Sequence, residues 1–589
     1  MLLSTLMRFY QSWLQLIALI IGTAVSYCAA SPVSAQVIPP PQDIIPPPQP
    51  NLPQPSTPEP LPPPEELIPS SPATPQPTQP TPDIPAAITV TRFEITGNTV
   101  FSQEELDRVL APFLNRPLSF TELFQARSAV TQLYINRGYI TSGALIPPQT
   151  LRNGVVTIQV VEGGLEAINV NGTRRLNQNY VRSRIATRTF TPLNQNRLLE
   201  ALQLLQLNPL IENISAELSA GSRPGTSILE VRVREAKTFG SQLAIDNARS
   251  PSVGSFRRRA QISEANLLGL GDGISVAYSN TNGSNSLDAS YSLPLNPRDG
   301  TLSFDYGITG SNIIEPPFDT LDIDANSRYY ELTWRQPLRQ TPTQEFAVGL
   351  TASRRETDIS SSVLEEAGTP LSVLSPGADD NGRTKLSSLR FFQEWTQRGR
   401  RQALAARSQF SIGLGVLNAT INDSAPDSRF FSWRGQAQLV RLLAPETLLV
   451  VRGEVQLADR TLLPIEQFGI GGQESIRGYR QDILLADNGV FASAEIRLPI
   501  YRSPQRRSVI QVAPFVDVGA VWNTSGARVS ESNTSDANTL VSVGLGLRWE
   551  LGNQLTARLD WGIPLVDISA GGRTWQESGV YFSIISNPF

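Results

Sequence analysis

The chain has 589 residues and a net charge of -4 at pH 7, which gives no reason to expect nucleic-acid binding. It has no histidine, which excludes histidine-based triads, general bases and metal ligands. Its two lysines, Lys237 and Lys385, lie outside any glycine-rich phosphate-binding loop. The single cysteine, Cys28, lies in a segment that we expect to be removed. No pair of carboxylates stands out as catalytic, so we expect neither an enzyme nor a bound metal or cofactor.

Residues 1–35 have the features of an export signal. Arg8 supplies a positive charge, residues 13–25 are mostly apolar, and residues 33–35 form a small-x-small cleavage site. An uncleaved membrane anchor is the alternative, because the apolar stretch Leu14–Ala30 is close to the lower length limit for a spanning helix. No later segment is apolar enough for such a helix, so a membrane protein with this sequence is not a helical bundle.

Residues 36–87 form a proline-rich linker that holds nearly half of the chain's 46 prolines. Such a segment has no core to bury and is expected to be an extended spacer. A ligand for a proline-binding partner is the alternative. The folded part of the chain is therefore predicted to begin near Ile88.

The region 88–235 is predicted to contain two units of about 75 residues, 88–162 and 163–235, with the same order of elements. Each unit begins with a strand pattern, continues with two helix patterns and ends with two strand patterns. In the first unit Ser102 is the predicted helix cap, and Glu105 occupies the capping-box position. The predicted elements are Phe93–Asn98, Ser102–Leu114, Ser119–Asn136, Tyr139–Ile146 and Val155–Val161, then Ile168–Gly172, Asn177–Thr187, Leu193–Leu207, Ile211–Leu218 and Ser227–Val233.

This β-α-α-β-β order, in tandem, resembles POTRA domains, which are the periplasmic modules of outer-membrane protein-transport machines. Two small α+β domains of another kind are the alternative. A short sheet with an exposed edge beside a helix can bind an extended peptide by strand addition. The sequence nominates no single contact residue for such a peptide.

Residues 236–589 alternate between apolar and polar side chains, with turns rich in glycine, asparagine, aspartate and proline. Between positions 490 and 498 the even-numbered residues are apolar, whereas Ser493, Glu495 and Arg497 lie on the other face. A soluble sandwich would alternate in the same way. The segment is long for one sandwich, however, and its polar face is small and charged, as in a water-filled lumen. The terminal Phe589 after an apolar strand pattern also favours an outer-membrane barrel.

A transmembrane antiparallel β-barrel of about 16 strands is therefore predicted, at roughly 22 residues for each strand with its share of loops. Polar stretches at Arg355–Lys385 and Asn523–Asn538 are predicted to be long external loops. The fold class is thus multi-domain, with two α+β POTRA-type domains followed by the barrel.

Two motifs in the barrel region carry a family resemblance. Ile476-Arg477-Gly478-Tyr479 matches a V/I-R-G-Y loop motif, and Phe515-Val516-Asp517-Val518-Gly519 matches an F-x-D-x-G strand motif. Asp246-Asn247 followed by residues 266–272 resembles the first barrel hairpin of the same family. With the two POTRA-like units, the chain resembles two-partner secretion transporters of the hemolysin-activator (ShlB/HecB) type, within the superfamily of outer-membrane assembly factors.

The resemblance gives these residues a role. It implies that a long loop folds into the barrel and that Arg477 at its tip meets Asp517, whose strand parity points it into the lumen. Arginine suits this contact because its planar fork can bind a carboxylate bidentately. The alternative is that Arg477 and Asp517 pair with other lumen charges, such as Glu495, Arg548 or Asp560. Arg497 is a further predicted lumen charge. The resulting hypothesis is a lumenal latch formed by Arg477, Gly478 and Tyr479 against Phe515, Asp517 and Gly519.

The resemblance also implies a function without a chemical step. A large exoprotein with an N-terminal secretion domain would dock on the POTRA domains and pass unfolded through a monomeric barrel in the outer membrane. One alternative is a factor that inserts other barrels into the membrane, although such relatives tend to have more POTRA units. Another is a passive porin, which would need neither periplasmic modules nor an arginine loop.

Overall fold

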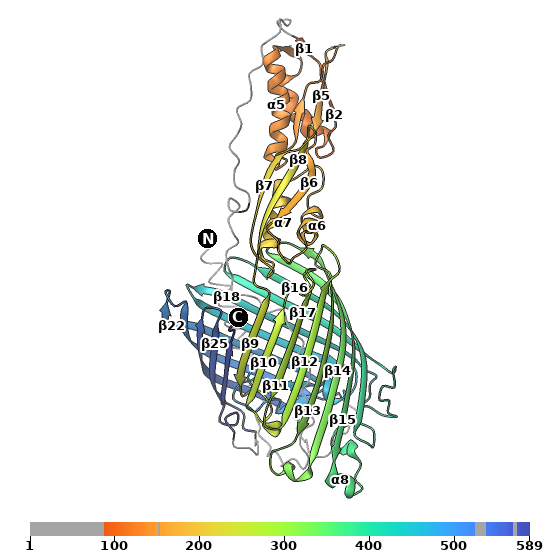
Figure 1. Cartoon of the computed structure of the whole chain (residues 1–589), viewed down its shortest axis with the longest axis vertical. Helices are drawn as coiled ribbons and strands as arrows, with labels where there is room; N and C mark the ends of the chain where they lie inside the picture. The colour runs from red at the N-terminus through yellow and green to blue at the C-terminus, as the bar shows by residue number, and fades with distance from the viewer. Residues whose placement is uncertain (1–66, 68–87, 151–152, 525–537, 569–573) are drawn as a thin grey trace.

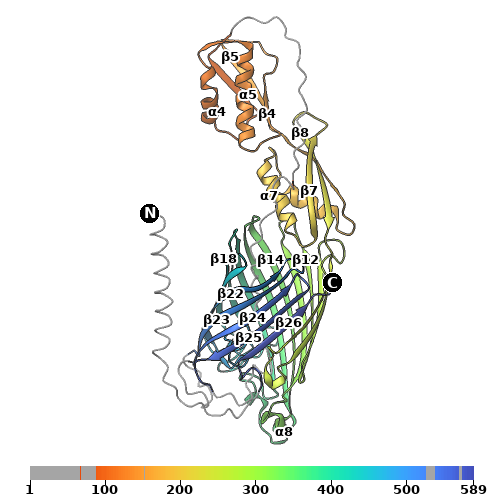
Figure 2. The ribbon, with the colours of Figure 1, turned by 90° about the vertical axis from the view of Figure 1, so that its left-hand side faces the viewer.

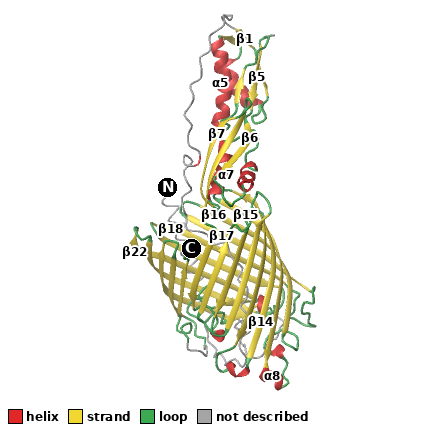
Figure 3. Ribbon diagram, in the orientation of Figure 1, coloured by secondary structure: helices red, strands yellow, loops and turns green. Residues whose placement is uncertain are grey.

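The computed structural model is an elongated molecule in which two small α+β domains are stacked on one end of a large β-barrel (Figures 1 and 2). It describes residues 67, 88–150, 153–524, 538–568 and 574–589. The predicted signal peptide, and all of the predicted linker except Leu67, lie outside these residues. Helices occur in the small domains and as short pieces at the far end of the barrel (Figure 3). None of the helices in the described ranges is long and apolar enough to cross a membrane.

The first domain packs two helices against a sheet with the strand order β2-β5-β4. Its first helix begins at the predicted cap Ser102, with Glu105 completing the capping box, and the second begins after Ser119 in the same way. A hydrogen bond from Arg116, with further bonds from Ser119, lowers the pKa of Glu122 to about 2 and keeps this capping carboxylate charged. The elements are β1 (Ile88–Val90), β2 (Arg92–Thr96), α4 (Gln103–Leu110), η1 (Ala111–Phe113), β3 (Arg116–Leu118), α5 (Phe120–Asn136), β4 (Gly143–Leu145) and β5 (Val155–Val161).

The strand predicted at Tyr139–Ile146 is shorter than the sequence pattern indicates. Helix α5 ends at Asn136, and Gly138, two residues further on, has a φ of +88°. The ring of Tyr139 then packs edge-on against Tyr134 and Phe101, at centroid distances of 6.0 and 6.3 Å. Because this aromatic packing holds Tyr139 against the helix, strand pairing begins only at Gly143.

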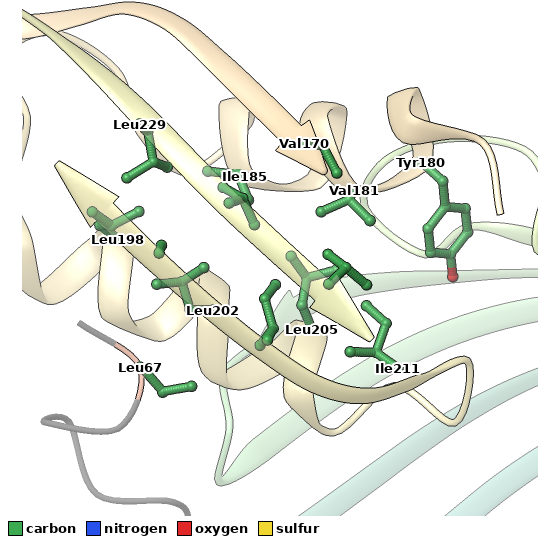
Figure 4. Packing of buried hydrophobic residues seen from close by; sticks show 14 of the residues in the cluster. Leu67, Val170, Tyr180, Val181, Ile185, Leu198, Leu202, Leu205, Ile211 and Leu229 are labelled. Atoms are coloured by element: carbon green, nitrogen blue, oxygen red, sulfur yellow. The ribbon is translucent and has the colours of Figure 1, made fainter. Parts of the chain in front are cut away.

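The second domain repeats the arrangement, with helices α6 and α7 against a sheet of order β6-β8-β7. Its core contains Leu198, Leu202 and Leu205 from one face of α7. Leu67, from the predicted linker, is 1% exposed and belongs to the same apolar cluster (Figure 4). The elements are β6 (Gly164–Asn171), α6 (Gln178–Ala186), α7 (Gln195–Gln206), β7 (Ile211–Ala220) and β8 (Thr226–Glu235).

Within the described residues, sixteen antiparallel strands form a closed barrel, as predicted from the sequence. The last strand pairs with the first, from Ser583 opposite Asp246 to Ser586 opposite Leu243. The strands are β9 (Phe239–Asp246), β10 (Arg257–Glu264), β11 (Gly273–Asn280), β12 (Ser284–Pro294), β13 (Thr301–Asn312), β14 (Ile323–Gln340), β15 (Gln344–Ser361), β16 (Arg383–Arg398), β17 (Gln402–Leu414), β18 (Phe431–Ala444), β19 (Thr447–Ala458), β22 (Asn488–Ser503), β23 (Ser508–Trp522), β24 (Asn538–Leu551), β25 (Leu555–Pro564) and β26 (Val580–Ser586).

The side chains alternate across the barrel wall in the predicted way. On β22, Val490 and Ile496 are exposed on the outer face, whereas Ser493 and Glu495 are buried on the inner one. The long external loop predicted at Arg355–Lys385 is wrong in its bounds, because β15 continues to Ser361 and β16 begins at Arg383. Polar residues there alternate into the lumen, so polarity alone does not mark a loop. Most of the loop predicted at Asn523–Asn538 lies outside the described residues.

The second domain rests on the turns at the near end of the barrel. Arg184 on α6 forms an ion pair with Asp299 in the turn between β12 and β13, at 2.8 Å, and its guanidinium lies 3.4 Å from the centre of the Tyr180 ring. That ring also lies against Gly271, where an added Cβ would come within 2.3 Å of Tyr180. Charge pairing and close packing therefore fix the second domain directly over the barrel.

Candidate functional site

A long segment between β19 and β22 folds into the barrel, and we call residues 459–487 the inward loop. It contains a short antiparallel pair, β20 (Phe468–Ile470) and β21 (Leu484–Ala486). Its apolar side chains are buried in a cluster with residues of the barrel strands β22, β23 and β24: the cluster contains Phe468, Ile470, Ile476, Tyr479, Ala486, Phe491, Val521 and Leu540. The loop is therefore a packed part of the interior.

Arg477 is the most enclosed large side chain of the inward loop, with an exposed fraction of 0%. Its guanidinium binds Asp517 on β23 bidentately, with Nε donating to Oδ2 at 2.8 Å and Nη2 donating to Oδ1 at 2.9 Å. The backbone N–H of Arg477 also donates to Oδ2 of Asp517, at 3.1 Å. Three hydrogen bonds to one carboxylate thus fix both the main chain and the side chain of the loop tip.

The same guanidinium contacts further groups on the barrel strands. Nη1 donates to Glu495 on β22 at 2.6 Å and lies 3.7 Å from Asp560 on β25. The ring of Phe515 faces the guanidinium, with its centre 3.4 Å from Cζ, which is a cation–π contact. The structure therefore combines the two alternatives left open by the sequence, because Arg477 pairs with Asp517 and with the other lumen charges at once.

The remaining predicted lumen charges surround this contact. Arg548 links Glu495 to Asp560, at 2.9 and 2.7 Å, and Arg497 binds Glu495 at 2.8 Å. Arg558, which the sequence analysis does not nominate, pairs with Asp560 at 2.5 Å. It also pairs with Glu474 of the inward loop at 3.0 Å. The network therefore extends the attachment of the loop over four neighbouring strands.

The glycines of the two motifs make room for this arrangement. Gly478 has a φ of +98° and lies against the backbone of Gly562 on β25. Gly519 faces Ile476, and a Cβ at Gly519 would come within 2.7 Å of the Ile476 side chain. Each named position of the predicted strand motif thus has a physical role: Phe515 stacks on the guanidinium of Arg477, Asp517 binds it, and Gly519 leaves space for the side chain of Ile476.

Tyr479 attaches the loop to the end of the barrel sheet. Its hydroxyl donates to the carbonyl of Val541 at 2.8 Å and accepts from the N–H of Val566 at 3.1 Å. The hydroxyl of Tyr581 on β26 donates to the backbone carbonyl of Tyr479. Because both tyrosines are buried, these bonds satisfy polar groups that water cannot reach.

Sequence reasoning misses several residues of this site. Gly562 and Gly579 allow the loop backbone to approach, and Gln576 accepts a hydrogen bond from the N–H of Gln481 at 3.0 Å. In the sequence these positions show only a glycine or an amide residue near the end of a strand, and such residues are common in any barrel. They become recognisable only when the strands are closed into a ring.

The energetics of the site favour a defined position of the loop over a loose one. Removing one partner of a buried, hydrogen-bonded ion pair costs about 3–5 kcal/mol, because the other charge is left without compensation. Arg477 and Asp517 are both 0% exposed, so each depends on the other. The buried pair therefore holds the tip of the inward loop against the barrel wall.

Comparisons with known proteins agree with this architecture. Residues 225–549 match the family of haemolysin secretion/activation proteins ShlB/FhaC/HecB, and residues 88–163 match the ShlB-type POTRA domain. The chain belongs to the ShlB/FhaC/HecB family. It is accordingly an outer-membrane transporter of two-partner secretion, with its POTRA domains in the periplasm. This membership favours secretion over the insertion of other barrels.

Individual relatives are distant but cover most of the chain. The heme/hemopexin transporter protein HuxB of Haemophilus influenzae is 22% identical over 458 residues, which are 75% of this chain and 77% of HuxB. The outer membrane transporter CdiB of Escherichia coli is 25% identical over 491 residues, which are 81% of this chain and 79% of CdiB.

Solved structures share the fold. CdiB from Escherichia coli has a TM-score of 0.64 at 22% identity, and the match covers 86% of this chain and 92% of the CdiB chain. BamA from Haemophilus ducreyi, lacking POTRA domains 1–3, has a TM-score of 0.52 at 15% identity, and the match covers 85% of this chain and 100% of the BamA chain.

The close approach of Gly562 to the loop predicts a steric variant with no change in charge. In Gly562→Ala the new Cβ would lie 2.5 Å from the backbone nitrogen of Gly478, which must move. Overpacking of about 1–3 kcal/mol should raise the population of displaced loops about 5- to 150-fold. We expect faster trypsin cleavage after Arg477 or Arg480 in the folded protein, measured by mass spectrometry.

Gly399→Ala is the matched control, because its Cβ would meet nothing closer than 3.6 Å. Equal cleavage rates in the two variants would contradict the packing described for the loop tip.

Proposed function

We propose that this transporter binds an unfolded exoprotein on its two periplasmic domains and passes it through the barrel lumen when the inward loop leaves its seat. The observation that carries the proposal is the position of Arg477, a fully buried cation on a loop within a ring of charged strands. A loop packed across the interior leaves no room for a second chain in the same place. Transport therefore requires the contacts of Arg477 to change.

The second domain offers a docking site for an extended peptide. β6 is an edge strand of its sheet, and a hollow of about 480 Å³ lies between this edge and α6, lined by Leu165, Ile168, Arg182 and Ala186 among others. Arg182 donates to the carbonyl of Ile168 at 3.0 Å, so one carbonyl of the edge strand takes a side-chain donor in place of a neighbouring strand. A strand of the exoprotein can add to this edge and place alternate side chains in the hollow.

The barrel closes within a single chain, which supports a monomeric transporter. The energy for transport would come from the exoprotein, because an unfolded chain that folds outside the cell cannot slide back. In this scheme the transporter supplies recognition, a path and a gate. The identity of the exoprotein does not enter the scheme.

The first test concerns the seat of the loop. Arg477→Ala should abolish secretion of the exoprotein while the barrel still reaches the outer membrane, because without its seat the loop no longer returns to the one position from which the exoprotein displaces it. Arg477→Lys should also secrete poorly, because a single ammonium group cannot bind Asp517 bidentately and reach Glu495 at the same time. Secretion is measured by immunoblotting of the culture medium, and barrel levels by heat-modifiable mobility of the membrane fraction.

Arg502→Ala is the matched control, since its side chain is 59% exposed at the near end of β22. Normal secretion by Arg477→Ala at normal barrel levels would refute the gating role of the loop.

The second test concerns the docking hollow. Ala186→Trp places a large ring in the space beside β6 and should weaken binding of the exoprotein's N-terminal secretion domain by about 10-fold or more, or 1.4 kcal/mol. Titration calorimetry with the full transporter measures the change. Ala220→Trp, at an exposed position on β7, serves as the control. Equal affinities for both variants would argue against docking at this edge.

A further inference from the structure

Besides the ion pairs of Arg477, Glu474 and Arg480, the inward loop has a charged contact at its base, on a different part of the barrel wall from Arg477. Glu466 ends the short turn η5 (Pro464–Glu466) near the start of the loop, and its side chain is 9% exposed. Its Oε1 accepts a hydrogen bond from Nη2 of Arg390 on β16 at 2.6 Å and lies 4.0 Å from Nη1 of Arg355 on β15. Neither the predicted latch nor the proposed gate includes these residues.

The two arginines belong to a compact group of four charges. Each has a side chain that is 8% exposed, and both also pair with Glu331 on β14, at 2.7 Å from Arg355 and 3.3 Å from Arg390. Two arginines thus face two carboxylates. The barrel wall supplies Glu331, and the inward loop supplies Glu466. Without Glu466 the wall would present two buried arginines to a single carboxylate, an arrangement that is costly in an enclosed site.

An apolar contact coincides with this charged one. Leu462, Leu463 and Ile465, which directly precede Glu466, are buried in one cluster with residues of the same three strands and of nearby loops. The strand residues in the cluster include Ile323, Ile359 and Leu386, from β14, β15 and β16. Two independent kinds of contact therefore attach the start of the loop to this part of the wall.

The attachment lies across the lumen from the seat of Arg477. Arg477 contacts β22, β23 and β25, whereas Glu466 contacts β16 and, through its partners, β14 and β15. Around the closed barrel, β17, β18 and β19 separate the two sets on one side, and β26 with β9–β13 separates them on the other. In Figure 1, β14 and β15 lie on the right of the barrel and β22 and β25 on the left.

We propose that Glu466 is a second anchor of the inward loop, which ties its base to Arg390 and Arg355 and limits how far the loop swings when Arg477 leaves its seat. The inference rests on the proposed gating function. The loop spans the lumen between two walls, and the path is set by which anchor releases. Glu466 acts through the position of the loop and does not itself need to touch the exoprotein.

The test is the conductance of the purified full chain in planar lipid bilayers. Glu466→Gln keeps the size of the side chain but leaves the arginine pair with one carboxylate, so the base of the loop should detach more often. We expect the fraction of time in the open state to rise about 5-fold or more. Glu366→Gln makes the same charge change at an exposed position on α8 and should match the wild type.

A charge swap separates this role from a general effect on folding. Glu466→Arg combined with Arg390→Glu keeps two cations and two anions in the cluster and should restore the open fraction toward the wild-type value. A wild-type open fraction in Glu466→Gln, or no restoration in the swap, would overturn the second anchor. If Glu466→Gln fails to form a heat-modifiable barrel, the swap alone decides.

The outcome is distinguishable from failure of the gate itself. If Arg477→Ala still secretes normally, the proposed function fails whatever Glu466 does. If Arg477→Ala blocks secretion and Glu466→Gln conducts like the wild type, only the second anchor is lost.

Discussion

The structure depends on one buried ion pair, between Arg477 and Asp517. A guanidinium and a carboxylate that are both withdrawn from water are stable only when each satisfies the other, and here the pair uses three hydrogen bonds to do so. This requirement explains the surrounding residues. Phe515 covers one face of the guanidinium, and Glu495 accepts a hydrogen bond from its Nη1. Gly478 and Gly562 allow the backbones of the loop and of β25 to come close together. A closed barrel is what allows a charged loop to be enclosed in this way.

The periplasmic half of the molecule is joined to this site through rigid contacts. Arg184 and Tyr180 seat the second domain on the barrel turns at Asp299 and Gly271. The docking hollow on β6 belongs to the same domain, so a bound peptide would be held at a fixed position above the barrel. The two small domains and the barrel follow one another along the length of the molecule (Figure 2), so the proposed docking hollow would lie before the proposed path through the lumen.

Much of this arrangement could be predicted from the sequence, because it rests on local rules. The period-two alternation predicted the inward direction of Asp517 and, together with the length of the region and its small, charged polar face, the barrel; Ser102 and Glu105 predicted the start of the first helix. The same rules failed at Arg355, where a polar stretch indicated a loop but is the lumen side of a long strand. They could not find Gly562, Tyr581 or Glu466, since these residues matter only through contacts that form when distant strands close into a ring.

The central claim, that Arg477 holds the loop inside the lumen, is tested most directly by measuring the position of the loop. Spin labels at Gln481→Cys in the loop and Arg398→Cys at the near end of β16, with Cys28 replaced by serine, allow a distance measurement by double electron–electron resonance. The account predicts one dominant distance when Arg477 is present and a second population when Arg477 is changed to alanine. An unchanged single distance in the Arg477→Ala protein would contradict it.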